Sequence, residues 1–213
     1  MHVFMGGTFD PVHSGHLQGA REVCQLLGTD SIYLLPAKVP VHKTAPHTST
    51  AARLAMLEIA IEPFPEIHLD LREVRSSAAS YTIDTLKQLR AELGAQSPLI
   101  MVIGMDSFST LPSWRGHRQF LSLCHIIVLQ RPNYQLAQSP EHHSLMQQQA
   151  DNSDELKASS AGKLLFYQQS PLNISASEIR QQLQKSLTPE LLPSAVADYI
   201  KQHQLYKSML AAT

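Results

Sequence analysis

The sequence predicts an α/β fold, a single doubly wound domain with a mainly parallel sheet of about six strands. Three observations lead to this prediction. Short apolar runs alternate along the chain with segments whose apolar residues recur at helical spacing. Two of these runs, residues 98–104 and 125–130, are apolar almost throughout, as is typical of central parallel strands. The length of 213 residues suits one domain, residues 1–213, with a substantial core.

The first half of the chain contains the first strands and helices of this pattern. A strand starts at residues 2–4 and runs into a glycine turn. A helix follows from Gly15 onwards, and Gly28 is a natural helix stop. The other predicted elements are strands over 31–37 and 67–74, the latter half-exposed, and helices marked by Leu54, Leu57 and Ile61 and by Ile83, Leu86, Arg90 and Leu93.

The second half adds strands over residues 98–104, 125–130 and 164–169. It ends in an amphipathic helix candidate within residues 193–206. Residues 131–163 are rich in Gln, Ser, His and Asn, so we interpret them as a polar surface insertion within the domain. Sheets of this kind bind ligands at the carboxyl ends of their strands, near a topological switch point. Functional residues are therefore expected in the loops that follow the strands.

Composition narrows the function further. The net charge is −1 with neutral histidines, which argues against a general nucleic-acid binder. The N-terminus does not resemble a signal peptide, and the chain contains no apolar run of about 18 residues that could span a membrane. Cys24 and Cys124 are isolated, so we expect inert buried thiols and a reducing compartment. These features predict a cytoplasmic protein.

The stretch GGTFDPVHSGHL, residues 6–17, predicts an anion site. Gly6 and Gly7 allow the backbone to turn sharply and approach a ligand closely. The following helix start offers N–H groups and a positive dipole end, and His13 and His16 can donate hydrogen bonds there. The stretch matches neither the P-loop nor GxGxxG. A metal pair without a nearby third ligand and simple helix capping are the alternative interpretations.

A second stretch, ISASEIR at residues 174–180, predicts another helix start. Ser175 and Glu178 form the capping-box pattern S-x-x-E. The first turn also carries Ser177 and Arg180, and a hydroxyl with a guanidinium at a helix start suits a polyphosphate. The alternative is an ordinary capped surface helix.

These two stretches carry a resemblance to a known family. HSGH resembles the HxGH signature of the nucleotidylyltransferase superfamily, and ISASEIR resembles its ISxTxxR signature with Ser177 in place of Thr. The full first stretch resembles the opening of bacterial nicotinate-nucleotide adenylyltransferases. Residues 36–43, 80–86, 103–114 and 129–134 also resemble blocks of that family, with Val41, Ala79 and Asn133 as departures.

The resemblance implies a Rossmann-like adenylyltransferase of NAD biosynthesis. It would join ATP and nicotinate mononucleotide to give deamido-NAD and pyrophosphate, by direct in-line attack on the α-phosphate without a covalent intermediate. Mg²⁺ would be carried mainly by ATP, with no metal ligands from the protein. We expect no nucleic-acid or membrane partner, and a monomer or small homo-oligomer.

The same resemblance implies the site residues. The catalytic residues would be His13, His16, Lys43 and Arg180. ATP would be bound by Gly6, Gly7, Thr8, Phe9, His16, Gly104, Asp106, Ile174, Ser177 and Arg180. Nicotinate mononucleotide would be bound by Lys43, Tyr81, Thr82, Trp114 and Arg115.

Several of these assignments have alternatives. Trp114 could stack on a pyridine ring or be a partly buried core residue. Asp106 could face the adenosine ribose or be a helix N-cap, and Lys43 could be a solvated loop lysine. An enzyme that prefers the amide mononucleotide, a nucleotide-binding module without catalysis and a fragment of a tRNA synthetase are the rival functions.

Overall fold

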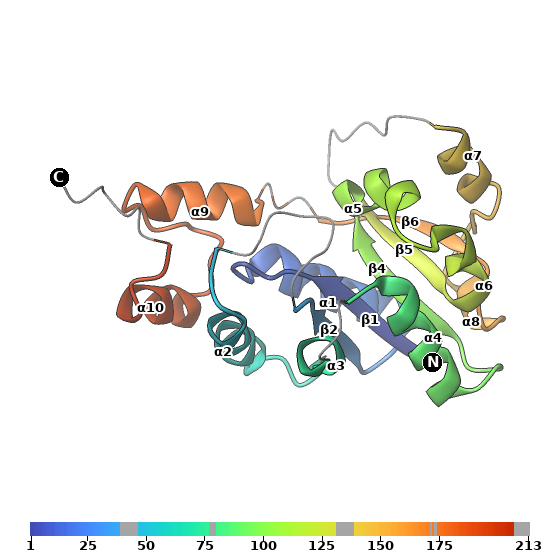
Figure 1. Ribbon diagram of the computed structural model, residues 1–213, viewed down its shortest axis with the longest axis horizontal. Helices are drawn as coiled ribbons and strands as arrows, with labels where there is room; N and C mark the ends of the chain where they lie inside the picture. The colour runs from blue at the N-terminus through green and yellow to red at the C-terminus, as the bar shows by residue number, and fades with distance from the viewer. Residues whose placement is uncertain (39–46, 77–79, 131–138, 171, 173, 207–213) are drawn as a thin grey trace.

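The structure is a computed structural model that describes residues 1–213 except 39–46, 77–79, 131–138, 171, 173 and 207–213. Within the described residues, six strands form one sheet in the order β3-β2-β1-β4-β5-β6, and all neighbours are parallel (Figure 1). This is the Rossmann-like strand order, and it confirms the predicted doubly wound α/β fold. The strands are β1 (His2–Gly7), β2 (Ile32–Pro36), β3 (Ile67–Leu69), β4 (Leu99–Gly104), β5 (His125–Gln130) and β6 (Leu164–Gln168).

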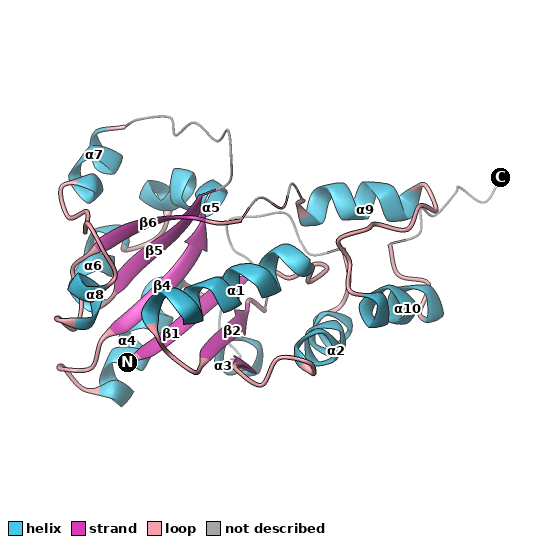
Figure 2. Ribbon diagram, turned by 180° about the vertical axis from the view of Figure 1, so that it is seen from behind, coloured by secondary structure: helices cyan, strands magenta, loops and turns pink. Residues whose placement is uncertain are grey.

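Helices cover both faces of the sheet. Figure 2 shows α1 (Ser14–Leu27) across one face, and Figure 1 shows α4 (Thr82–Leu93) on the other. Strand β1 alternates between these layers, because Val3 and Met5 join the core under α1 while Phe4 joins the core under α4. The remaining helices are α2 (Thr50–Ile61), α3 (Arg72–Arg75), α5 (Met105–Thr110), α6 (Phe120–Leu123), α7 (Pro140–Met146), α8 (Asp154–Lys157), α9 (Ala176–Gln184) and α10 (Ser194–Gln202), with 3₁₀ turns η1 (Leu111–Ser113) and η2 (His117–Gln119).

The predicted strand over residues 67–74 is wrong in its second half. Strand β3 ends at Leu69, and residues 72–75 form the helical turn α3. The carboxylate of Asp70 accepts hydrogen bonds from the backbone N–H of Arg72 at 3.0 Å and from its Nε at 2.6 Å. These local bonds turn the chain, although the alternation of polar and apolar residues continues.

The helix predicted around residues 54–61 exists, but its buried stripe is shifted by one residue. Leu54 and Ile61 are only partly buried. The buried residues of α2 are Arg53, Met56, Leu57 and Ala60. A charged side chain therefore lies on the buried face of this helix.

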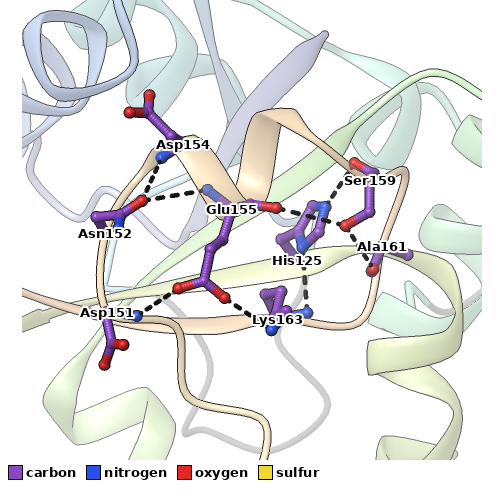
Figure 3. A network of polar contacts seen from close by, with 8 residues as sticks. All are labelled: His125, Asp151, Asn152, Asp154, Glu155, Ser159, Ala161 and Lys163. Carbon is purple, nitrogen blue, oxygen red and sulfur yellow. Dashed lines mark hydrogen bonds and ion pairs between the residues drawn. The ribbon is translucent and has the colours of Figure 1, made fainter.

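The predicted polar insertion begins in undescribed residues, and its described part, 139–163, contains α7 and α8. Its end is fastened to the sheet by the network in Figure 3. Nδ1 of the fully buried His125 accepts from the Lys163 N–H at 3.1 Å, and its Nε2 lies 2.9 Å from the Ser159 carbonyl oxygen. The Lys163 ammonium pairs with Glu155 at 2.8 Å.

Two further predictions concern membrane-spanning segments and the two cysteine thiols. In the part of the chain that the structure describes, no helix is long and apolar enough to cross a membrane. Both cysteines are free and buried, as predicted. Burial raises the pKa of the Cys24 thiol to about 11 and also raises that of Cys124, so both remain protonated near neutral pH.

Candidate active site

The switch point of the sheet lies between β1 and β4, the two central strands. Two cavities of about 350 Å³ and about 410 Å³ open beside the carboxyl ends of these strands. They share one wall, made of Gly6, Gly7, Thr8, Asp106 and Ser107. The site therefore lies where the fold predicts a ligand, and it is divided into two adjoining parts.

The first cavity brings together three segments that are distant in sequence. They are the glycine–histidine loop, the start of α5 and the start of α9. The predicted catalytic residue His13 lines it, together with nine of the ten residues predicted to bind ATP, namely Gly6, Gly7, Thr8, Phe9, His16, Gly104, Asp106, Ser177 and Arg180. Ile174 is buried behind Gly15, so it supports the wall from outside the lining.

The two histidines lie at the start of α1. His13 is the N-cap and only 1% exposed, and its ring stacks on that of His16 with 3.7 Å between centroids. The backbone N–H of His13 donates to Nδ1 of His16 at 3.3 Å. A neutral His16 ring then carries its proton on Nε2, where it can be donated to a ligand.

Gly15 makes this stacked arrangement sterically feasible. A Cβ at this position would lie 3.1 Å from the His13 ring and 3.2 Å from Ile174. The helix start is also less open than predicted, because the Ser14 N–H donates to the carbonyl of Leu191 at 3.0 Å. The imidazoles and the remaining N–H groups therefore carry the anion-binding capacity of this end.

The predicted cap of the second motif is present at α9. Ser175 is the N-cap, and its Oγ accepts from the Glu178 N–H at 3.2 Å. Arg180 donates from Nη2 to Ser177 Oγ at 3.1 Å and from Nη1 to the Asp10 carbonyl at 2.7 Å. The serine that replaces threonine thus keeps a hydrogen-bonding hydroxyl, and Arg180 is directed toward the first motif.

Two glycines of the first cavity, Gly6 and Gly104, differ in the space that surrounds them. A Cβ on Gly6 would meet no heavy atom within 4 Å, so the space beside it is open to a ligand. A Cβ on Gly104 would lie 2.8 Å from Oδ1 of Asp106. Gly104 is the N-cap of α5, so the alternative of Asp106 as N-cap is wrong.

The second cavity is lined by Thr82 and Trp114 of the predicted acceptor site. Thr82 is the first residue of α4, where backbone N–H groups face outward. The Trp114 indole donates to Thr110 Oγ1 at 3.3 Å and packs edge-on to Phe120 at 6.3 Å. It is therefore both a cavity wall and a partly buried core residue, so the two interpretations are compatible.

Other predicted acceptor residues lie beside this cavity or outside the described chain. Tyr81 and Arg115 are not among its lining residues, and the Arg115 guanidinium lies 4.7 Å from the centre of the Tyr81 ring. The backbone N–H of Trp114 already donates to the carbonyl of Leu111 at 2.9 Å. The backbone N–H of Arg115 is therefore the remaining candidate donor to the nicotinate carboxylate. Lys43 and the departures Val41, Ala79 and Asn133 fall outside the described residues.

The sequence analysis missed Asp10, although it lies inside the first motif. Its carboxylate is 3% exposed and accepts from the His47 N–H at 2.7 Å and from the Thr48 hydroxyl at 2.8 Å. The Tyr206 hydroxyl donates to it at 2.6 Å, and burial together with this bond raises the pKa of Tyr206. No local pattern links Asp10 to a tyrosine near the other end of the chain.

Three further polar residues near the cavities were also missed. Gln169 lines the first cavity and donates to the Gly15 carbonyl at 2.9 Å. Glu73 lines the second cavity and accepts from the Thr85 hydroxyl at 2.7 Å, and burial raises its pKa. Arg53 is 1% exposed behind the shared wall, and its place on an otherwise apolar helix face is a signal that the sequence did contain.

A dedicated metal centre is not evident in this part of the molecule. Among the described residues, no group of three or more His, Cys, Asp or Glu side chains could hold a metal ion. Asp10 lines the first cavity, but its oxygens already accept the hydrogen bonds described above.

The fold and its divided site define a doubly wound α/β protein with two adjoining cavities at the switch point, where such sheets bind ligands. The sequence model of the family described as "Cytidylyltransferase-like" matches residues 4–182. The chain belongs to this family of nucleotidyltransferases, which confirms the resemblance found in the sequence.

Similar proteins support the same grouping. A protein of Pseudomonas putida (strain W619) is 40% identical over 205 residues, which cover 96% of this chain and 94% of that relative. A protein of Hahella chejuensis is 41% identical over 212 residues, covering 98% and 97%. Both are named probable nicotinate-nucleotide adenylyltransferase.

Solved structures show the same fold. The Plasmodium falciparum nicotinic acid mononucleotide adenylyltransferase complexed with NaAD matches with a TM-score of 0.73 and 20% identity over 96% of each chain. The same enzyme complexed with APC matches with a TM-score of 0.71.

Proposed function

We propose that this chain transfers the adenylyl group of ATP to nicotinate mononucleotide, giving deamido-NAD and pyrophosphate in NAD biosynthesis. The observation that carries the proposal is the pair of adjoining cavities with the shared wall of Gly6, Gly7, Thr8, Asp106 and Ser107. Two substrates that react with each other need adjacent binding sites, so that their reacting atoms come into contact where the two cavities adjoin. The names of the relatives that are about 40% identical point to the same reaction.

The first cavity suits ATP. His13 and His16 would contact the α- and β-phosphates, because both rings lie at the start of α1. Ser177 and Arg180 would hold the β- and γ-phosphates from the start of α9. Asp106 would accept hydrogen bonds from the ribose hydroxyls, and the open space beside Gly6 would admit the nucleotide.

The second cavity suits the acceptor mononucleotide. The Trp114 indole would stack on the pyridine ring. The nicotinate carboxylate would be held by the Thr82 hydroxyl, the start of α4 and the Arg115 N–H. Lys43 would contact the mononucleotide phosphate and offset the repulsion between the two anionic substrates.

The chemistry then follows from alignment and charge stabilisation. A phosphate oxygen of the mononucleotide attacks the α-phosphorus in line, and pyrophosphate leaves from the opposite side. The phosphate is already anionic, so no general base is needed and no covalent enzyme intermediate forms. His16, with its proton on Nε2, would stabilise the charge that develops on the transferred and leaving phosphates.

Mg²⁺ fits this scheme as a companion of ATP. The described carboxylates form no cage for it, and Asp10 in the first cavity already accepts hydrogen bonds from Thr48 and Tyr206, so its ligands would be ATP oxygens and water. When bound, the ion neutralises part of the phosphate charge.

The test is a pyrophosphate-release assay with ATP and either nicotinate or nicotinamide mononucleotide, side by side. We expect release with the acid and a lower kcat/KM with the amide. A higher kcat/KM with the amide would show that nicotinamide mononucleotide, and not nicotinate mononucleotide, is the preferred acceptor. A folded protein that binds ATP but releases no pyrophosphate with either acceptor would reduce the chain to a nucleotide-binding module.

A further inference from the structure

A buried arginine holds the ends of two strands together behind the shared wall. Nη1 of Arg53 donates to the carbonyl oxygen of Thr8 at 2.7 Å and to that of Ala37 at 2.8 Å. Its Nη2 donates to the carbonyl of Lys38 at 2.8 Å and to the hydroxyl of Thr50 at 3.2 Å. One side chain of α2 thus joins the loop after β1 to the loop after β2.

We propose that Arg53 is a positioning residue for adenylyl transfer, which sets the distance between the ATP side and the acceptor side of the site. The proposal rests on the proposed function. Thr8 lines both cavities, and Ala37 lines the second one. Lys38 leads directly into the segment that carries Lys43, the residue expected to contact the acceptor phosphate.

The hydrogen bonds of the buried Arg53 guanidinium indicate a role beyond packing in the core. The Arg53 side chain is 1% exposed, and none of its hydrogen bonds within the described residues goes to a carboxylate. Burying a guanidinium without an ion pair is costly, and that burial lowers the pKa of Arg53. A planar fork that bonds three carbonyls fixes two loops at once, which a lysine ammonium on a flexible stem does poorly.

The position of the charge also favours a functional role. Both proposed substrates are anionic, and the guanidinium bonds the carbonyl of Thr8, which follows the two glycines of the shared wall. A fixed positive charge in this low-dielectric place lowers the cost of bringing two anions together. The carboxylate whose electrostatic influence reaches Arg53 is that of Asp10, whereas the raised pKa of Tyr206 keeps its hydroxyl protonated.

Arg90 provides a matched control. Its guanidinium also donates to backbone carbonyls, including those of Leu123 at 2.7 Å and Ser97 at 2.7 Å. These carbonyls precede β5 and β4, so they lie at the amino ends of the parallel strands, opposite the site. Arg90→Ala therefore removes a comparable structural fork without touching either cavity.

The experiment compares Arg53→Ala, Arg53→Lys and Arg90→Ala with the unmodified chain. Steady-state pyrophosphate release is measured with ATP and nicotinate mononucleotide, well below the Tm of each variant. We expect kcat to fall about 10²-fold in Arg53→Ala, because a misplacement of about 1 Å costs that much. We expect a fall of roughly 10-fold in Arg53→Lys, which keeps the charge but loses the fork. Added methylguanidinium should restore part of the Arg53→Ala rate.

Arg90→Ala should lower Tm while its kcat stays at the level of the unmodified chain. An unchanged kcat in folded Arg53→Ala, an equal fall of kcat in Arg90→Ala, or no rescue by methylguanidinium overturns the proposal. If Arg53→Ala does not fold, an unchanged kcat in Arg53→Lys overturns it. An unmodified chain that releases no pyrophosphate instead overturns the proposed function, which separates the two failures.

Discussion

Gly104 offers a way to disturb the nucleotide site with a single methyl group. It ends β4 and caps α5 with φ −79° and ψ 165°, a conformation that any residue can adopt. A Cβ there would lie 2.8 Å from Oδ1 of Asp106, its only close contact. The carboxylate is the far end of a flexible side chain, so in Gly104→Ala it should rotate away while the backbone stays in place.

The expected magnitudes separate folding from binding. Because the backbone conformation suits alanine, we expect the free energy of unfolding to change by no more than about 1 kcal/mol. Rotation of Asp106 would remove the hydrogen bond that we propose it accepts from the ribose, and bonds to charged groups contribute about 1.5–3 kcal/mol. At about 1.4 kcal/mol per factor of ten, KM for ATP should rise roughly 10- to 100-fold.

The assay is steady-state turnover with ATP varied at saturating mononucleotide, with Tm measured in parallel. Gly104→Ala, Asp106→Ala and the double variant form a cycle. If the methyl group acts only through the carboxylate, the double variant should show the KM of Asp106→Ala alone. An added rise in KM in the double variant, or an unchanged KM in Gly104→Ala, would refute this reasoning.

Three other predictions follow from the geometry. His16→Ala should lose about 10²–10³-fold in kcat and remain folded, and near-normal turnover of the folded variant would remove His16 from the mechanism. Ser177→Ala should raise KM for ATP about fivefold by releasing one guanidinium nitrogen of Arg180, which a measured KM within twofold of normal would contradict. Burial lowers the pKa of His125 below 6.5 in the folded protein. The unfolded chain therefore binds this proton more readily than the folded one, and the free energy of unfolding should fall as pH drops below about 6.5. Urea unfolding between about pH 7.5 and pH 5.5 should show a smaller fall for His125→Gln than for the unmodified chain, and equal falls would speak against this source.

The parts of the fold that were predictable are those with local causes. Gly28 and Gly94 end their helices with φ of 62° and 76°, a region that favours glycine, so the sequence alone marks both stops. Strand β4 is apolar on both faces because helices cover both. The turn after Leu69 was not predictable from periodicity, because a single side chain, Asp70, redirects a segment that still alternates.

The candidate site likewise has parts that could be predicted from local sequence and parts that could not. The two motifs could be placed because each helix start is specified by a few consecutive residues, such as Ser175 and Glu178. The supporting contacts could not be placed, because their partners are remote in sequence. Arg180 reaches the Asp10 carbonyl across 170 positions, and Tyr206 reaches the Asp10 carboxylate across 196.

These remote contacts explain how a nucleotide site can be made from both ends of one chain. The start of α1 is covered by the carbonyl of Leu191, and Asp10 is fixed by Tyr206 and by the residues that precede α2. Each contact closes a long loop, whose entropic cost is recovered only when the sheet between the two ends has formed. The groups proposed to bind phosphate therefore depend on contacts that the completed domain supplies. The contacts between the two ends of the chain do not link the ends of β1 and β2 to each other. Arg53 of α2 supplies this link through its hydrogen bonds to Thr8 and Ala37.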